Sequence, residues 1–292
     1  MSRPANLQGI AAMVVSVAFF ALMDAAMKYL ANDYPALQIA AMRGLASLPL
    51  VCGYVIWRRQ LGSLVRIRWR LHLLRGILGV AMLPLFVFAM RDLSMSSVYT
   101  IVFVAPLLIT VLSVPVLKEK VRPAHWVAIG IGLIGVLVAL RPSGAGYLSL
   151  GAMAALLAAA CYSVSAVLGR LVSRTDSSAS LIFWGTAILT LGAGVLALPN
   201  WVTLQPQHGW VLPVLGLTGF GGQLAITQAF RHGQASVVAP FEYTALAWAI
   251  ALDWLIWSTL PDHYTLIGGA IIIASSVYLI RHEKAQVPAT PA

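Results

Sequence analysis

Two carboxylates in the second half of the chain lie in an apolar segment at a spacing that places them on one helix face. Glu242 follows Pro240, and Asp253 comes 11 residues after Glu242. At about 100° and 1.5 Å per residue, an α-helix carries both acids on nearly the same side, roughly 16 Å apart. A carboxylate on the wall of a cavity within a membrane can bind an ammonium group or take up a proton. Asp253 neighbours Trp254 and Trp257, so a structural role at the membrane interface stays open for it.

Opposite charges also occur in the first part of the chain, again inside apolar segments. Asp24 and Lys28 are four residues apart, so they can form an ion pair on one helix face. The alternative is that Asp24 binds a substrate or a proton. Arg43 is permanently charged, and its guanidinium can bind a substrate carboxylate through two hydrogen bonds. Arg43 can instead pair with an acid of a neighbouring helix such as Asp24, and both alternatives stay open.

Several aromatic and amide side chains lie deep within the apolar segments, away from the expected headgroup regions. Their polar atoms need hydrogen-bond partners there, so these side chains either line a cavity or pack between helices. Besides Asp24, Arg43 and Glu242, the substrate-binding candidates are Tyr99, Tyr162, Trp184, Gln223, Tyr243 and Trp248. Proline lacks an amide hydrogen and interrupts or bends a helix. Pro106 and Pro240 are therefore candidate bending points for gating.

The remaining motifs do not support catalysis or metal binding. The run from Gly130 to Gly135 matches G-x-G-x-x-G, but it lies inside an apolar segment rather than after a β-strand, so it predicts close helix packing. The six histidines fall in loops or at segment ends, and the two cysteines, Cys52 and Cys161, lie in apolar segments. We therefore expect no catalytic residue, no metal site and no cofactor.

The composition indicates which kind of element positions these residues. Of the 292 residues, 60% are hydrophobic and only 10% are charged, whereas soluble domains carry about 25% charged residues. This composition excludes a soluble enzyme and a nucleic-acid-binding domain, despite the net charge of +10. A helix needs about 20 apolar residues to cross a bilayer. Stretches of this kind cover residues 7–30, 36–57, 73–90, 96–116, 124–140, 148–169, 179–198, 211–230, 236–258 and 264–280.

Lysine and arginine are distributed unevenly between the expected connections. With the N-terminus in the cytoplasm and ten crossings, 15 of the 19 basic residues fall on the cytoplasmic side and three on the other. Arg75 is counted with the cytoplasmic group, and Arg43 lies within a span. Because basic residues accumulate on the cytoplasmic side of membrane proteins, we expect a multi-pass protein of the cell membrane with both termini in the cytoplasm.

The two halves of the chain resemble each other. Residues 89–119 can be aligned with residues 229–259 at an offset of 140. Each half contains five expected spans, and since five is an odd number, the second half enters the membrane from the opposite side. Inverted repeats of this kind enclose a binding site near the membrane midplane. We predict an all-α membrane protein of ten transmembrane helices, in which two inverted five-helix repeats, 7–141 and 147–281, surround a central cavity.

Several different short motifs are distributed along the chain in a recognisable order. They are Arg75-Gly76, Ala89-Met90-Arg91, Ala105-Pro106-Leu107, Leu117-Lys118-Glu119-Lys120 and the segment from Ala235 to Thr244. In order and spacing they resemble the drug/metabolite transporter superfamily in its EamA-type branch, including YddG-like amino-acid exporters. The resemblance implies ten helices around a central cavity and carrier-type movement of small metabolites. Thr259 stands at the position matching Glu119, where the family often has a second glutamate. The resemblance therefore does not imply a glutamate role that is shared by both halves.

The resemblance and the candidate residues together predict a secondary transporter in a bacterial inner membrane. We expect it to export small metabolites, above all aromatic and other neutral amino acids, by alternating access. A zwitterion needs an acid, a cation and an apolar wall, which Glu242 or Asp24, Arg43 and the deep aromatic residues supply. The expected partners are this cargo, membrane lipids and protons as a candidate coupling ion, but not nucleic acid. The alternatives are uptake or exchange of a cofactor-like metabolite such as S-adenosylmethionine, or an intramembrane enzyme acting on lipids.

Overall fold

The computed structural model describes residues 3–65, 67–118, 123–140, 149–233, 235–260 and 262–285. Throughout these ranges the regular structure is helical, and no β-strand occurs in them. The α-helices are α1 (Arg3–Leu30), α2 (Ala36–Trp57), α3 (Trp69–Asp92), α4 (Met95–Val102), α5 (Val104–Leu117), α6 (Pro123–Leu140), α7 (Leu150–Val172), α8 (Ser178–Ala197), α9 (Val211–His232), α10 (Ala235–Val238), α11 (Ala245–Trp257) and α12 (His263–Ala285). The 3-10 helices are η1 (Leu61–Leu64), η3 (Leu198–Asn200), η4 (Pro206–His208) and η5 (Ala239–Thr244).

Seven helical segments of the described residues are long and apolar enough to cross a membrane. They are Asn6–Leu30, Ala36–Trp57, Trp69–Asp92, Met95–Leu117, Leu150–Val172, Ser178–Asn200 and Pro206–His232. Two shorter apolar helical stretches, Trp126–Gly135 and Leu266–Ser275, lie within α6 and α12. The chain is therefore a multi-pass membrane protein.

The local sequence explains where several of the helices begin. The hydroxyl oxygens of Ser94, Ser149 and Ser177 each accept the backbone N–H three residues later, at 3.0–3.2 Å. These contacts satisfy donors that would otherwise be unpaired in the first turns of α4, α7 and α8. Pro35, which has no N–H to lose, directly precedes α2.

Two of the predicted spans are interrupted. The span expected at 96–116 consists of α4 and α5, which meet at Phe103. Pro106 follows this break and cannot donate a backbone hydrogen bond to the carbonyl four residues earlier. The span expected at 236–258 consists of α10, η5 and α11, and the tighter 3-10 turns of η5 contain Pro240.

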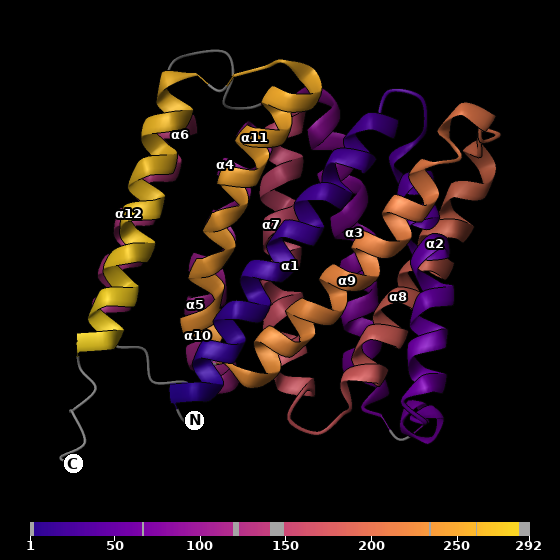
Figure 1. The fold of residues 1–292 in the computed structure, drawn as a ribbon, viewed down its shortest axis with the longest axis horizontal. Coiled ribbons are helices and arrows are strands. Elements are labelled where there is room, and N and C mark those ends of the chain that lie inside the picture. Colours follow the sequence, from indigo (N-terminus) through magenta and orange to yellow (C-terminus); the bar gives the residue numbers. More distant parts are fainter. Residues whose placement is uncertain are drawn as a thin grey trace.

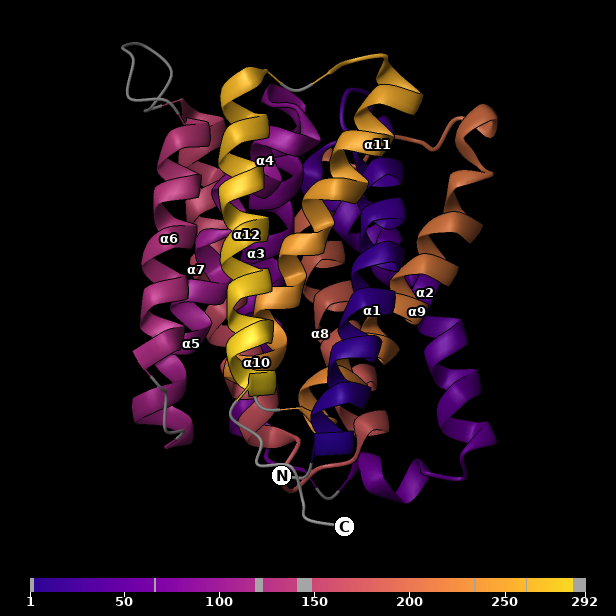
Figure 2. The ribbon, with the colours of Figure 1, turned by 60° about the vertical axis from the view of Figure 1, so that its left-hand side comes forward.

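Helices from the two halves of the sequence are interleaved. In Figure 1 and Figure 2, α1 packs against α9, α2 against α8 and α9, and α3 against α7 and α8, while α12 packs against α6 at one side of the bundle. We call the end of the bundle at which α1 begins and α12 ends the proximal end, and the opposite end the distal end (Figure 1). Side chains from both halves therefore enclose the centre of the bundle.

Glycine permits the closest of these helix contacts. An added Cβ at Gly216 of α9 would lie 2.6 Å from the backbone oxygen of Ala46 in α2. Gly132 belongs to the glycine run for which we predicted close packing, and an added Cβ there would lie 3.3 Å from the Tyr243 hydroxyl oxygen. Gly216 thus lets the backbones of α2 and α9 approach each other within the membrane, whereas Gly132 leaves room for the side chain of Tyr243.

Candidate functional site

A cavity of about 270 Å³ lies in the centre of the bundle, between helices of both halves. Residues of α1, α2, α3, α7, α8 and α9 form most of its wall, and α4, α5, η5 and α11 contribute to the rest. On α7 the lining residues are Ala158, Tyr162, Ser165, Ala166 and Gly169, and Ser173, which directly follows the helix, continues the same line. These positions share one helix face and extend over roughly 22 Å at 1.5 Å per residue. The cavity is therefore long and narrow, running along much of α7.

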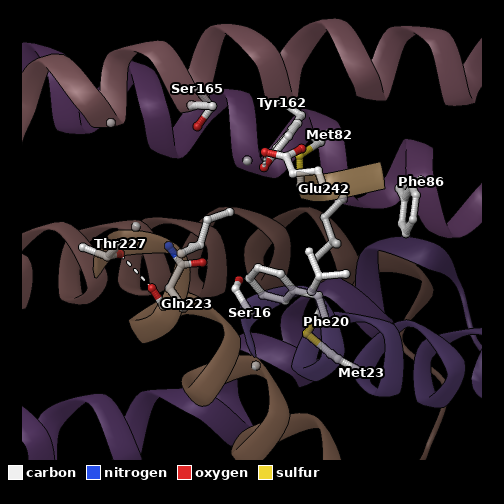
Figure 3. A pocket seen from close by; sticks show the side chains of 18 of the residues that line it. Ser16, Phe20, Met23, Met82, Phe86, Tyr162, Ser165, Gln223, Thr227 and Glu242 are labelled. Carbon is white, nitrogen blue, oxygen red and sulfur yellow. Dashed lines mark hydrogen bonds between the residues drawn. The ribbon is translucent and has the colours of Figure 1, made fainter. Parts of the chain in front are cut away.

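Glu242 enters the cavity from η5 and meets Tyr162 of α7. The Tyr162 hydroxyl donates a hydrogen bond of 2.9 Å to Glu242 Oε1. Figure 3 shows the two side chains together, with Gln223 and Thr227 of α9 also lining the cavity. An ionised carboxylate has about four acceptor sites. One tyrosine donor thus leaves Glu242 able to accept hydrogen bonds from a ligand in the cavity.

Asp24 of α1 forms a second carboxylate–tyrosine pair in the wall. The Tyr99 hydroxyl donates a hydrogen bond of 2.5 Å to Asp24 Oδ2. The Tyr99 ring lies 6.0 Å from the ring of Phe86 and 6.4 Å from that of Phe103, measured between centroids. All four residues line the cavity, so the acid lies in a largely aromatic part of the wall.

The alternative of an ion pair between Asp24 and Lys28 is not realised. Lys28 Nζ lies 3.0 Å from Asp253 Oδ1, and Asp253 Oδ2 also accepts the backbone N–H of Ser96 at 2.9 Å. Lys28 lies in the last turn of α1, from which its long side chain reaches α11, while Asp24 faces Tyr99. Asp253 is not among the residues lining the cavity, and it has a structural role at the distal end.

Arg43 of α2 lines the cavity without a carboxylate partner in the described part of the chain. Its Nε lies 3.0 Å from the sulfur of Met23, which is a weak acceptor. No carboxylate oxygen lies within 4.0 Å of the Arg43 guanidinium, since the ion pairs among the described residues involve Lys28 and His72. The alternative of a direct pair with Asp24 is therefore not realised, and the guanidinium can bind an anionic ligand.

Three candidates lie away from the cavity wall. Trp184 donates its Nε1–H to the carbonyl oxygen of Leu64 at 3.0 Å, which ties α8 to η1. Tyr243 is buried, with its ring 5.1 Å from that of Phe103 and its hydroxyl towards α6. Trp248 is 41% exposed on the outer side of α11. Depth in an apolar segment predicted these residues, but depth does not determine which way a helix face points.

The two prolines proposed for gating lie at the interrupted spans. Pro106 lines the cavity in the first turn of α5, and Pro240 belongs to η5. Glu119, the acid of the repeat motif, lies outside the described residues. Among the residues that the structure does describe, no group of three His, Cys, Asp or Glu side chains could hold a metal ion.

Sequence reasoning missed one charged residue of the cavity wall. Arg75 was predicted to belong to the basic cytoplasmic group, but α3 already begins at Trp69, and Arg75 lies on the wall nearly two helical turns inside it. Arg75 lies within the apolar stretch that forms α3, and this position could have identified it. Counting the basic residues in each connection takes no account of that position.

Known proteins resemble this chain in sequence over nearly its whole length. The EamA-like transporter family matches residues 7–141 and 149–281. The pseudopaline exporter CntI of Pseudomonas aeruginosa is 26% identical to this chain over 278 residues, covering 94% of this chain and 97% of that protein. The S-adenosylmethionine uptake transporter of Rickettsia prowazekii is 24% identical over 278 residues, covering 95% and 94%. The riboflavin transporter of Vibrio cholerae is 26% identical over 281 residues, covering 95% and 94%.

A solved structure supports the same fold. A crystal structure with 18% sequence identity superimposes with a TM-score of 0.75, covering 98% of this chain and 100% of the other. The family matches account for both halves of the sequence and for nearly all of the described helices. This chain belongs to the EamA-like transporter family.

Proposed function

We propose that this protein is a secondary transporter that carries small zwitterionic metabolites through the central cavity by alternating access. The supporting observation is that one narrow cavity holds the acids Asp24 and Glu242 as well as the guanidinium of Arg43, which has no carboxylate within 4.0 Å. A charge within a membrane is costly unless it is paired. A zwitterion would supply a cation for an acid and a carboxylate for Arg43.

Neutral amino acids, aromatic ones included, are the cargo that we propose first. Phe20, Phe86 and Phe103 provide an apolar wall beside the polar groups. The volume of about 270 Å³ lies just below the range of roughly 300–1,000 Å³ for ligand pockets, which favours a small cargo. The proposed direction is export, the direction given in the name of the pseudopaline exporter.

A larger, cofactor-like cargo is the second candidate. Relatives named for S-adenosylmethionine uptake and for riboflavin transport have about the same identity to this chain as the exporter. The extent of the cavity along α7 favours this alternative, because an elongated molecule would fill it better than an amino acid. An enzyme acting on lipids is no longer a candidate, since the family consists of transporters.

The proposed membrane arrangement has ten helices in two inverted five-helix repeats, 7–141 and 147–281. The succession of helices supports it when α4 with α5, and α10 with η5 and α11, are each taken as one crossing. The proximal end then faces the cytoplasm of a bacterial inner membrane, in line with the excess of lysine and arginine in the connections expected there.

Counterflow into proteoliposomes tests the proposed function. Vesicles containing the purified protein and loaded with an unlabelled amino acid should accumulate the same labelled amino acid, whereas Glu242→Gln should accumulate little. S-adenosylmethionine and riboflavin in parallel vesicles test the second candidate, and an imposed pH gradient tests coupling to protons. Folded wild-type protein that moves no amino acid in a broad panel would exclude the first candidate.

A further inference from the structure

Arg75 of α3 presents a second guanidinium to the cavity, closer to the proximal end than Glu242. Its Nε and Nη1 atoms are buried and have no hydrogen-bond partner in the protein. The guanidinium lies against α7, where an added Cβ at Gly169 would be 3.4 Å from Arg75 Nε and 3.5 Å from Cζ. Both residues line the cavity, and the separation from the added Cβ is an ordinary van der Waals contact, so the guanidinium lies directly beside this face of α7.

No acid of the described residues neutralises Arg75. The ion pairs within 4.0 Å are Lys28 with Asp253 and His72 with Asp176. Asp176 lies near the same end of the bundle, but its oxygens accept hydrogen bonds from His72, Thr175 and the backbone of Arg68. An arginine is charged at every physiological pH, and a buried charge without a partner costs several kcal/mol. The position is therefore stabilised when an anion enters the cavity.

We propose that Arg75 binds a carboxylate of the transported molecule, an inference that rests on the proposed transport function. The planar guanidinium matches a carboxylate through two parallel hydrogen bonds, whereas an ammonium group could not make this pair. Two of its donor nitrogens are already buried and unpaired, so a ligand would satisfy them without displacing a protein partner.

The α7 positions beside Glu242 and Arg75 lie far enough apart along the helix to limit the kind of molecule that can engage both residues. Glu242 contacts Tyr162, and Arg75 contacts Gly169, seven residues further along the same lining face of α7. Seven residues are two helical turns, or roughly 10 Å. In an α-amino acid the ammonium and carboxylate groups are attached to one carbon atom, so it reaches one site at a time. A molecule that occupies both sites is an extended zwitterion, with its cationic nitrogen near Glu242 and a carboxylate at Arg75.

The wall between the two sites suits such a molecule. Ser165 and Ala166 lie between Tyr162 and Gly169 on the same face of α7, and Met82 and Gly79 line the cavity from α3. Figure 3 shows Ser165, Tyr162 and Met82 around the cavity. On the α3 and α7 side these residues form a mostly apolar wall with one hydroxyl, against which a methylene spacer between two charged ends can pack, while Gln223 and Thr227 line the cavity from α9.

Thermal stabilisation of the purified protein by ω-amino acids of increasing chain length tests the inference. A ligand that binds the folded state raises the unfolding temperature, and at a fixed ligand concentration the rise increases with the logarithm of its affinity. We expect the affinity of the wild type to rise with chain length to an optimum at an end-to-end distance of roughly 10 Å. Methyl esters of the same compounds, which lack the carboxylate, should show no such optimum. Equal affinity at all lengths, or no stabilisation by any member, would overturn the inference.

Substitutions of Arg75 test whether this residue causes the optimum in ω-amino-acid chain length. Arg75→Gln should weaken binding of the long ω-amino acids by about 10- to 100-fold, the loss expected for a hydrogen-bonded charge, while the methyl esters bind as they do to the wild type. Arg75→Lys should restore part of the affinity, and Arg58→Gln, at an exposed position outside the cavity wall, should have no effect. An unchanged optimum in Arg75→Gln overturns the inference.

The two proposals fail in different ways. Amino-acid counterflow measured with the same wild-type preparation reports on the transport function alone. Wild type that transports amino acids but shows no chain-length optimum retains the proposed function and loses the role of Arg75. If Arg75→Gln does not fold, the Arg75→Lys variant and the comparison of acids with esters on the wild type decide the question.

Discussion

Lys28 of α1 and Asp253 of α11 form an ion pair, with 3.0 Å between Nζ and Oδ1, that joins the two halves of the chain at the distal end. Asp253 is 1% exposed and also accepts the N–H of Ser96 in the first turn of α4. Lys28 Nζ lies 4.4 Å from the ring centroid of Trp257, so a cation–π contact supports the same geometry. Three helices are thus held together by one buried carboxylate.

Removing the charge of Asp253 should destabilise the protein. Asp253→Asn leaves the Lys28 ammonium without its anion, and breaking a buried pair by removing one partner costs about 3–5 kcal/mol. We expect a fall of several degrees in the unfolding temperature of the detergent-solubilised protein. Asp33→Asn, at an exposed position near the same end, should change stability by less than about 0.5 kcal/mol. Equal unfolding temperatures for the two variants would contradict a stabilising role for the pair.

The hydroxyl of Tyr162 should matter for cargo binding more than for stability. Tyr162→Phe removes the donor that holds Glu242 Oε1 at 2.9 Å and leaves the ring in place. A hydrogen bond to a charged group contributes about 1.5–3 kcal/mol, so the KM for amino-acid counterflow should rise about tenfold or more. Tyr54→Phe, which lies outside the cavity wall, is the matched control. If the KM of Tyr162→Phe stays at the wild-type value, the hydrogen bond between Tyr162 and Glu242 does not contribute to cargo binding.

The sequence alone predicted the helices well and the pairing of side chains poorly. Apolar length placed α2 at the residues observed, because the cost of unpaired backbone in lipid forces long helices. Apolar length did not predict the interruption at Phe103, which lies three residues before Pro106, a candidate bending point. The partner of Lys28 lies 225 residues away in the chain. No local pattern contains that information, since it depends on how α1 and α11 pack.

For the candidate site too, the sequence indicates which residue types lie inside the membrane but not which way their side chains point. Asp24 and Glu242 could be found because an acid in an apolar segment is rare and needs a reason to be there. Trp184 and Tyr162 both lie inside their apolar segments, yet only Tyr162 faces the cavity. The hydrophobic pattern of helices that are apolar on all sides contains little directional information.

Helix packing through glycine provides a test that is independent of transport. In Gly216→Ala the new Cβ would lie 2.6 Å from the backbone oxygen of Ala46, an atom that cannot move without shifting α2. Overpacking of this kind costs about 1–3 kcal/mol, so the unfolding temperature should fall. Gly53→Ala is the control on α2, because no heavy atom lies within 4 Å of its added Cβ, and alanine favours a helix by about 1 kcal/mol over glycine. A Gly216→Ala variant as stable as Gly53→Ala would show that α2 and α9 are less closely packed.

The connection between α7 and α8 holds the start of α3 through Asp176, and this contact should depend on pH. Asp176 Oδ2 accepts hydrogen bonds from His72 Nε2 at 2.9 Å and from the backbone N–H of Arg68 at 3.1 Å. Partial burial of Asp176 raises the pKa of its carboxyl group, but the hydrogen bonds from Thr175, Arg68 and His72 outweigh it and leave the pKa below the ordinary value of 3.8. A lowered pKa means that the folded state favours the ionised form, so this stabilisation is present above the unfolded pKa and is lost as the pH falls through the folded pKa.

Asp176→Asn should therefore lower the unfolding temperature at neutral pH, by an amount corresponding to about 1.5–3 kcal/mol for a hydrogen-bonded charge. The contribution of the ionised carboxylate to this difference should shrink as the pH falls from about 5 through the ordinary carboxyl pKa of 3.8. Unfolding followed by tryptophan fluorescence over this range measures it, and Asp92→Asn, at an exposed position, serves as the control. A difference that grows as the solution becomes more acidic would have the wrong sign for a carboxylate stabilised in its ionised form.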